Sequence, residues 1–334
     1  MWIREVDVPA VLVNEFRAGN LVLFVGAGAS VDQPASLPTF VGLTKRIAID
    51  AHHDFDDAEL EHPDVLLGRI KDRGVDVHHI IKTIIGDPAS APNDLNRAIA
   101  RLAAAGSRVR IVTTNYDPHL SSALRDLGVS FAEYRGPAVP MGDDFDGVVY
   151  LHGDLTQEPR HLIATEGDLG RAYLTDAWAA RFVERMFAKY TVLFIGYSHN
   201  DTVMRLIARG VGGARRQRYA LTHQADRDVW KTYGVVPIKY EVTGHSHAAL
   251  ADALNGWAAL TSMGLHDHRQ RTARLVGAPP SLVPEDVSYL GGKPSVNGTS
   301  PCATRRVDPP DCRSCRSPPQ PLRWSPLPSR HPSK

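Results

Sequence analysis

The chain has 334 residues, 43% hydrophobic and 22% charged, which is enough apolar material for one large α/β domain or two small ones. It contains no run of about 18 apolar residues, which excludes a membrane-spanning helix and predicts no membrane partner. The net charge of +1 is uneven, because residues 291–334 carry eight Lys/Arg against two Asp and residues 1–290 carry 30 Lys/Arg against 35 Asp/Glu. Such a mildly acidic body gives no reason to expect a nucleic-acid partner.

The N-terminal residues and the cysteines predict a cytoplasmic location. Arg4 and Asp7 interrupt the stretch where a secretory signal needs an apolar core. All three cysteines lie within residues 302–315, too few and too clustered to staple a secreted fold. The Cys-x-x-Cys pair among them has irregular spacing to any further ligand, so no metal is expected.

Apolar β-branched runs alternate with helical patterns over the first 260 residues. Several of these runs are continuously apolar, as expected for strands buried on both faces of a parallel sheet. The predicted strands are residues 21–25, 109–113, 148–151, 191–195, 217–221 and 235–240. The predicted helices are residues 8–18, 39–51, 94–105, 168–190, 201–209 and 247–260. This order predicts an α/β fold with a doubly wound, Rossmann-like parallel sheet.

Two regions depart from the alternation. Residues 54–86 are helical and rich in charge and histidine, and they predict a helical insertion at about 52–90. Residues 291–334 hold ten of the 24 prolines and seven serines, a composition that predicts a disordered tail. We therefore expect a domain over 1–262, a connector or the start of a truncated element over 263–290, and a disordered tail over 291–334. One hypothesis is that this tail is a truncated or out-of-frame end that replaces a natural downstream domain; a native tail is the alternative.

The segment LVLFVGAGAS, residues 21–30, predicts a phosphate-binding turn between a strand and a helix. Gly26 and Gly28 let the backbone approach a pyrophosphate, and Ser30 adds a hydroxyl donor. The pattern lacks the third glycine of the dehydrogenase fingerprint and the Gly-Lys-Ser/Thr of a Walker loop. A tight turn without a ligand is the alternative.

Three further strands end in polar or small residues, and parallel strands place their carboxyl ends at one edge of the sheet. Thr114, Asn115 and Asp117 follow the second strand, His152 follows the third, and residues 196–198 follow the fourth. Taken singly, these residues fit turns, helix caps or a structural histidine equally well. Their convergence on one edge favours a site.

These motifs, taken in order, resemble the sirtuin superfamily, and most closely its divergent bacterial members that act in antiviral defence by depleting NAD. The motifs are GAGAS at 26–30, LPTF at 37–40, TTNYD at 113–117, LHGD at 151–154 and FIGYS at 194–198. The resemblance implies NAD as substrate, with the pyrophosphate on the first turn, the nicotinamide beside the second motif, and ribose or phosphate on the last. It implies as substrate-binding residues Gly26, Ala27, Gly28, Ser30, Pro38, Phe40, Thr114, Asp117, Gly196, Tyr197 and Ser198.

The resemblance also implies that Asn115 and His152 are catalytic. Nicotinamide departs from NAD as a neutral group, so the leaving group needs no general acid. Asn115 can bind a ribose hydroxyl or fix a water molecule, and His152 can accept a proton from either.

Departures from the deacetylase pattern favour hydrolysis of NAD itself. Residues 155–190 contain no cysteine where deacetylases carry zinc-binding pairs, and Thr114 and Val41 replace the usual Gln and Arg. The predicted activity is therefore NAD glycohydrolysis, restrained by a regulatory partner or a homo-oligomer. The alternatives are an NAD-dependent deacylase or ADP-ribosyltransferase, and a non-catalytic NAD or ADP-ribose sensor. Two histidine pairs, His78 with His79 and His245 with His247, are expected at the surface.

Overall fold

The structure is built around a sheet of seven parallel strands, and this confirms the predicted α/β fold. The computed structural model describes residues 1–198, 216–224, 228–244, 246–279 and 283–291. The strand order across the sheet is β5-β6-β4-β3-β7-β8-β9. The strands are β3 (Leu21–Val25), β4 (Arg110–Thr113), β5 (Ala132–Arg135), β6 (Gly147–Tyr150), β7 (Thr191–Ile195), β8 (Arg218–Thr222) and β9 (Val235–Lys239). A separate antiparallel pair, β1 (Trp2–Ile3) and β2 (Val6–Asp7), precedes them.

The central strand β3 marks the point where the connections change direction. The chain passes from β3 to β4, β5 and β6 on one side, and then crosses to β7 on the other side of β3. In open parallel sheets, ligands bind outside the carboxyl ends of the strands at such a switch point. The ends of β3 and β7 are therefore where a site is expected.

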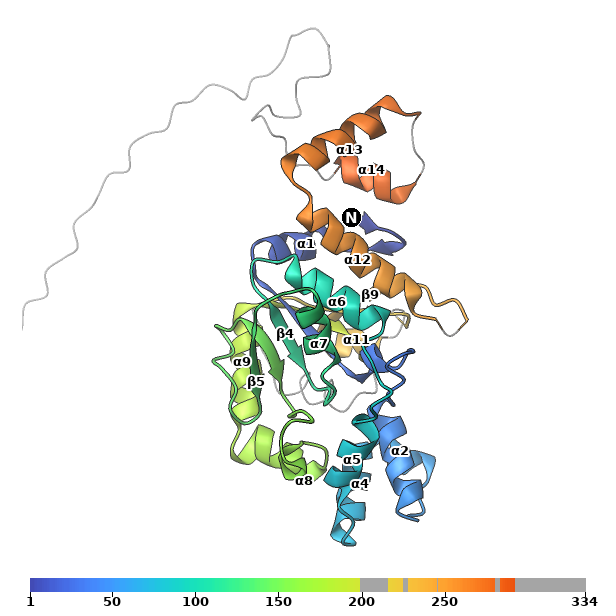
Figure 1. Ribbon diagram of the computed structural model, residues 1–334, viewed down its shortest axis with the longest axis vertical. Helices are drawn as coiled ribbons and strands as arrows, with labels where there is room; N and C mark the ends of the chain where they lie inside the picture. Colours follow the sequence, from blue (N-terminus) through green and yellow to red (C-terminus); the bar gives the residue numbers. More distant parts are fainter. Residues whose placement is uncertain (199–215, 225–227, 245, 280–282, 292–334) are drawn as a thin grey trace, which may run out of the picture. The chain divides into compact units, whose positions relative to one another are not determined.

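Helices cover both faces of the sheet. Leu21, Leu23 and Val25 belong to the core cluster that includes residues of α1 (Ala10–Arg17), α6 (Asp94–Ala104), α7 (His119–Asp126) and α12 (Ala248–Ser262). Of these helices, α6 and α12 lie side by side (Figure 1). Val22 and Phe24 point to the opposite face, where they join the cluster that contains α9 (Trp178–Lys189). This alternation follows from the period of two along a strand and explains why β3 is apolar throughout.

The helices vary widely in length. In chain order they are α1 (Ala10–Arg17), the 3₁₀ turn η1 (Ala27–Ser30), α2 (Phe40–Asp50), α3 (Asp57–Leu60), α4 (Pro63–Asp72), α5 (Val77–Ile85), α6 (Asp94–Ala104), α7 (His119–Asp126), the 3₁₀ turn η2 (Pro159–His161), α8 (Glu166–Gly170), the π-helix η3 (Arg171–Thr175), α9 (Trp178–Lys189), α11 (Val229–Thr232), α12 (Ala248–Ser262), α13 (Leu265–Gly277) and α14 (Pro284–Gly291).

The predicted helical insertion is present as α3, α4 and α5, which lie with α2 between β3 and β4 in sequence (Figure 1). These helices have an apolar cluster of their own, in which Leu43 of α2, Leu66 of α4 and Ile81 of α5 are buried. The same cluster includes Tyr116 and Leu162 from the loops at the sheet edge. The insertion is therefore packed against the carboxyl edge of the sheet.

Some predicted elements were wrong or lie outside the described residues. The helix predicted over 168–190 is three segments, since Ala177 has a left-handed φ of 52° and interrupts it before α9. Neither α7 nor β5 was predicted, and the four residues of β5 are exposed or half-buried. The predicted strands otherwise differ from the observed ones by one residue at most. The helix predicted over 201–209 and the tail predicted to be disordered lie outside the described residues.

Candidate active site

Two glycine turns cross at the switch point. The Gly28 N–H donates to the Gly196 carbonyl at 2.9 Å, and the Gly26 N–H donates to the Ile195 carbonyl at 2.9 Å. A Cβ on Gly28 would lie 2.8 Å from the Gly196 oxygen, and a Cβ on Gly26 would lie 2.7 Å from the Tyr197 ring. Gly196 itself has a φ of +75°, which favours glycine. The close packing of the two turns therefore requires glycine at these positions, which the sequence alone did not reveal.

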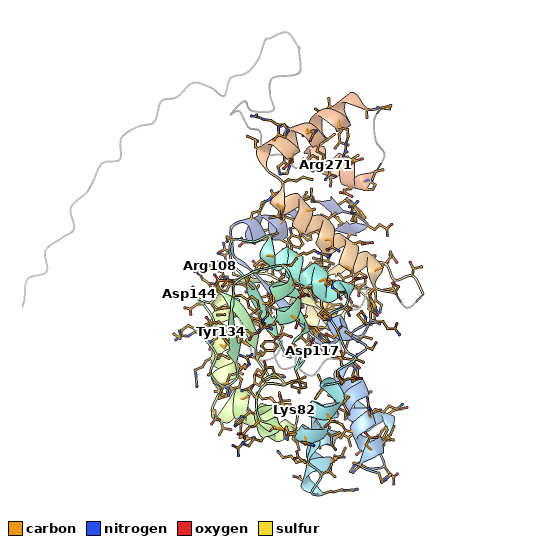
Figure 2. All side chains as sticks on the ribbon, in the orientation of Figure 1. Lys82, Arg108, Asp117, Tyr134, Asp144 and Arg271 are labelled. Carbon is orange, nitrogen blue, oxygen red and sulfur yellow. The ribbon has the colours of Figure 1, made fainter. Side chains whose placement is uncertain are left out.

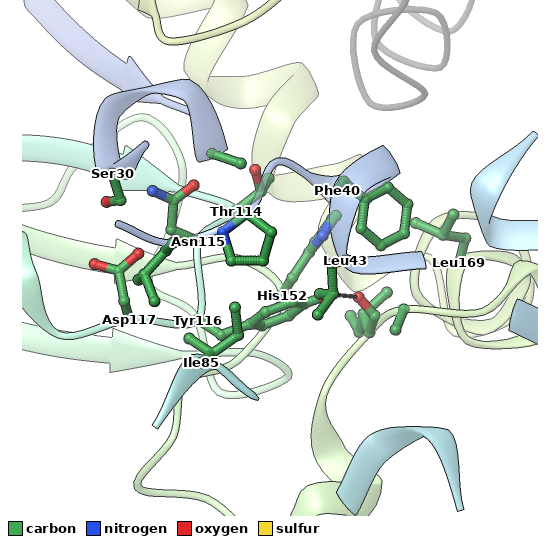
Figure 3. A pocket seen from close by; sticks show the side chains of 15 residues that line it. Ser30, Phe40, Leu43, Ile85, Thr114, Asn115, Tyr116, Asp117, His152 and Leu169 are labelled. Carbon is green, nitrogen blue, oxygen red and sulfur yellow. Dashed lines mark hydrogen bonds between the residues drawn. The ribbon is translucent and has the colours of Figure 1, made fainter. Parts of the chain in front are cut away.

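A first pocket lies beside this crossing, at the ends of β3, β4 and β6. It gathers eight of the predicted site residues, drawn in Figure 3: Ala27, Ser30, Pro38, Phe40, Thr114, Asn115, Asp117 and His152. Its remaining walls are mostly apolar and come from the segment up to α2, from α5 of the insertion, and from the loops after β4 and β6 up to α8: Leu37, Leu43, Ile85, Tyr116, Ile163, Ala164 and Leu169. Sequence reasoning missed this apolar lining, because it depends on segments that are distant in sequence.

Asn115 is the most unusual residue of the first pocket. Asn115 is only 6% exposed. Neither its amide nitrogen nor its amide oxygen has a hydrogen-bond partner in the structure. Leaving a buried amide unpaired costs about 1–3 kcal/mol per group, so such groups are rare in folded proteins. An Asn side chain lining a pocket in this state is suited to donate to and accept from a polar ligand.

His152 lies in the same pocket, directly after β6. It is 5% exposed, and its Nε2 is 3.1 Å from the Tyr173 hydroxyl. Burial lowers the pKa of His152 to about 4, against a smaller raising effect of the Asp168 charge. The imidazole is therefore neutral near pH 7 and can accept a proton.

Asp117 is also buried, behind the first turn. Burial raises its pKa, and the hydrogen bond from the backbone N–H of His119 opposes that rise. The His119 N–H donates to the Asp117 carboxylate at 3.1 Å, and the His119 ring lies 2.8 Å from the Ser90 hydroxyl. These contacts fix the end of β4 from which Asn115 projects.

A second pocket adjoins the first and shares Ala27 and Phe40 with it. It holds the other predicted residues except Gly26, namely Gly28, Gly196, Tyr197 and Ser198. The two pockets also meet at a hydrogen bond of 2.7 Å between the hydroxyls of Thr114 and Tyr197. Gly26 lies under the Tyr197 ring and lines neither pocket.

The second pocket contains residues that sequence reasoning missed or misplaced. It extends over the ends of β8 and β9 through Thr222, His223, Gln224 and Tyr240. His247, expected at the surface, is half-buried there, and its Nδ1 lies 2.8 Å from the Tyr240 hydroxyl. His245 lies outside the described residues.

His78 and His79, the other pair expected at the surface, differ in burial. His79 is exposed, but His78 is 5% exposed and its Nε2 lies 2.7 Å from the Asp168 carboxylate. This contact joins α5 to α8. Lys82, labelled in Figure 2, is also on α5. Its ammonium donates to the Gln157 carbonyl at 2.9 Å. The insertion is thus tied to the loop that follows His152.

Comparison with known proteins shows what part of the chain is similar to. Residues 109–238 match the SIR2-like domain family, a stretch that includes β4, β6, Asn115 and His152. This stretch is therefore similar to a SIR2-like domain, as the motifs indicated. A curated relative, the uncharacterised protein y4cA of Sinorhizobium fredii (strain NBRC 101917 / NGR234), is 30% identical over 307 residues. The alignment covers 82% of this chain, which spans about a quarter (25%) of the length of that relative.

Two solved structures are also similar. One is described as a structural basis for the mechanism and regulation of Sir2 enzymes, with 13% identity, a TM-score of 0.42, and coverage of 75% of this chain and 95% of that one. The other is a Sir2 homologue–NAD complex, with 13% identity, a TM-score of 0.38, and coverage of 76% and 94%.

The described part of the chain has neither a clustered metal-ligand set nor a helix that could span a membrane. No group of three or more His, Cys, Asp or Glu side chains among them is arranged as a metal site. Within the same residues, no helix combines the length and apolar character needed to cross a bilayer.

Proposed function

We propose that this chain is an NAD glycohydrolase, which cleaves the nicotinamide–ribose bond of NAD with water as the acceptor. The products are nicotinamide, ADP-ribose and one proton. The observation that carries this proposal is the buried, unpaired amide of Asn115 in a pocket with a neutral histidine. The SIR2-like domain match over the same residues supports NAD as the substrate class.

The two pockets divide the dinucleotide in this proposal. The apolar first pocket takes the nicotinamide and its ribose, and the second pocket takes the ADP portion. The crossing of the glycine turns between them holds the pyrophosphate near the backbone N–H groups of η1 and the Ser30 hydroxyl. Gly28 and Ser198 line the second pocket on the far side of that crossing.

The chemistry then follows from the neutral state of His152. As the bond to nicotinamide breaks, the ribose carbon becomes cationic, and the Asn115 amide binds a ribose hydroxyl or the attacking water. His152 accepts the proton that the water loses as it bonds to the ribose carbon. Such a positioned base contributes about 10²–10⁴-fold to the rate.

We further propose that this activity serves antiviral defence in the cytoplasm by depleting NAD, under the control of a regulatory partner or a homo-oligomer. The support is the set of five motifs shared in order with divergent bacterial sirtuin-like proteins. An NAD hydrolase without restraint would consume the cell's own NAD, which is why a controlling contact belongs to the proposal.

The test is nicotinamide release from NAD by the purified full chain, measured by chromatography without any peptide. We expect release by the wild type, and its loss in both Asn115→Ala and His152→Ala with the melting temperature kept. Tyr190→Phe is the matched control, because it removes a buried hydrogen bond to the Asp143 carbonyl at 2.8 Å that lies outside both pockets.

Other outcomes would overturn the proposal. Release that requires an acylated peptide or a protein acceptor would make the chain a deacylase or an ADP-ribosyltransferase. Saturable NAD binding without any release would make it a sensor. Full activity in His152→Ala would remove the proposed base.

A further inference from the structure

The segment between β6 and α9 contains a turn of π-helix. Thr165 caps α8 through a capping box, and the π-helix η3 then runs from Arg171 to Thr175. The Asp176 N–H donates to the Arg171 carbonyl at 2.9 Å, five residues back. A π-turn inserts one extra residue and so redirects the side chains near it, and such turns are frequent at functional sites. Here Tyr173 is half-buried, while its neighbour Leu174 is 80% exposed.

Asp168 fixes the position of this segment. Asp168 is 3% exposed. Its carboxylate accepts hydrogen bonds from His78 of α5 at 2.7 Å and from the Thr165 hydroxyl at 2.8 Å. The Arg171 guanidinium donates to it at 2.8 Å. Burial alone would raise the pKa of Asp168, but the hydrogen bonds from His78 and Thr165 lower it below its ordinary value, so the group is ionised. The insertion and the π-helix are therefore held together by a buried anion.

Tyr173 contacts His152 directly from this segment. Its hydroxyl lies 3.1 Å from His152 Nε2, and the two rings are 6.0 Å apart at 88°. A neutral imidazole carries one N–H, and the hydrogen bond at one nitrogen decides which tautomer is present. Nε2 is the nitrogen farthest from the backbone, so the Tyr173 contact also limits rotation of the ring.

We propose that Tyr173 is a positioning residue for His152: its hydroxyl accepts from Nε2–H, which holds the imidazole in one orientation and in the tautomer that leaves Nδ1 as the proton acceptor. This inference rests on the proposed NAD hydrolysis for its kinetic consequence, but the hydrogen bond can be tested without it. Asp168 and His78 act one step further back, because they hold the segment that carries Tyr173.

The test is Tyr173→Phe, which keeps the ring and removes only the hydroxyl. We expect kcat for nicotinamide release to fall about tenfold, as for loss of one hydrogen bond, while KM stays within about twofold. Tyr190→Phe is the matched control and is expected to leave kcat unchanged, since its hydroxyl bonds a backbone carbonyl outside the pockets. The melting temperatures of both variants measure any general loss of stability.

Nitrogen NMR of the imidazoles provides the second measurement. In the wild-type chain we expect the His152 signals of a single tautomer, and in Tyr173→Phe a mixture of the two. Unchanged His152 signals together with an unchanged kcat would overturn the inference. If the wild type releases no nicotinamide, the proposed function fails, and the tautomer signals alone still decide the role of Tyr173.

Discussion

The two neighbouring pockets satisfy their polar groups in different ways. In the second pocket the Gln224 N–H donates to the Thr222 hydroxyl at 3.1 Å, and the Tyr240 hydroxyl bonds His247 at 2.8 Å. In the first pocket both amide atoms of Asn115 are buried and unpaired. A ligand that enters the second pocket exchanges existing hydrogen bonds for new ones and gains mainly from apolar contact, whereas a ligand in the first pocket supplies bonds that the protein lacks.

This difference in hydrogen bonding assigns catalysis to the first pocket and substrate binding to the second. An unpaired group raises kcat if it bonds the transition state more strongly than the bound substrate, which is the role we propose for Asn115. Groups that are already satisfied contribute similarly to bound substrate and transition state, which affects KM. The predictions below test whether the two pockets divide in this way.

The largest effect is expected from Asn115→Ala. Removing a preorganised polar group of this kind lowers kcat by about 10²–10³-fold. Because the amide has no partner in the folded chain, its loss leaves no other group unpaired, and we expect the melting temperature to be unchanged or higher. Thermal unfolding and nicotinamide release measure the two effects. A clear fall in the melting temperature would mean that Asn115 is structural, and the comparison would then fail.

Gly28→Ala is expected to damage both pockets together. The added Cβ would lie 2.8 Å from the Gly196 oxygen and 3.1 Å from its Cα, and neither backbone atom can move without separating the two turns. We expect a loss of about 1–3 kcal/mol of stability, as for overpacking, with weaker NAD binding as well. Gly277→Ala is the control, since its Cβ meets nothing within 4 Å. Equal stability of the two variants in urea unfolding would show that the crossing is looser than described.

His247→Ala is expected to act on binding alone. It removes the partner of the buried Tyr240 hydroxyl and part of the second pocket's wall. We expect KM for NAD to rise about three- to tenfold with kcat unchanged, which is the pattern of lost uniform binding. Steady-state kinetics measures both constants. A fall in kcat that matches the one in Asn115→Ala would erase the distinction between the pockets.

Much of the sheet edge could be predicted from the sequence, because its signals are local. The continuous apolar run of β3 and the residues that follow each strand place Gly28, Asn115 and His152 at one edge through the geometry of parallel strands alone. Those same rules cannot say which of these residues lacks a partner. That property depends on how segments distant in sequence, which include Phe40, Ile85 and His152, come together around the first pocket.

The residues that were missed depend on contacts distant in sequence. His78 is buried because Asp168, 90 residues away, accepts its hydrogen bond. The break at Ala177 has no glycine or proline to mark it, so the pattern of residues 168–190 predicts one continuous helix. A continuous helix gives no reason to single out Tyr173, because it is the π-turn that sets the direction of its side chain.

The smallest expected effect concerns pH. A base with the ordinary histidine pKa of about 6.5 would lose roughly tenfold of its neutral form between pH 7.5 and 5.5. Since burial lowers the pKa of His152 to about 4, we expect kcat/KM to change less than about twofold over this range and to fall only near pH 4. The contribution of His152 to the free energy of unfolding falls with decreasing pH, in the same direction as kcat/KM. The unfolded chain binds a proton below about pH 6.5 and the folded chain does not until about pH 4, so this contribution is complete above 6.5 and is lost as the pH falls.

Asp117 provides the control for this profile, because burial raises its pKa and it lines the same pocket. An acid limb that disappears in Asp117→Asn belongs to that carboxyl and leaves the prediction for His152 intact. An acid limb near pH 6.5 that persists in Asp117→Asn would mean that His152 is hydrated in the working enzyme. The first pocket would then be as open to water as the second, and the unpaired Asn115 amide would be solvated between turnovers instead of waiting for a ligand.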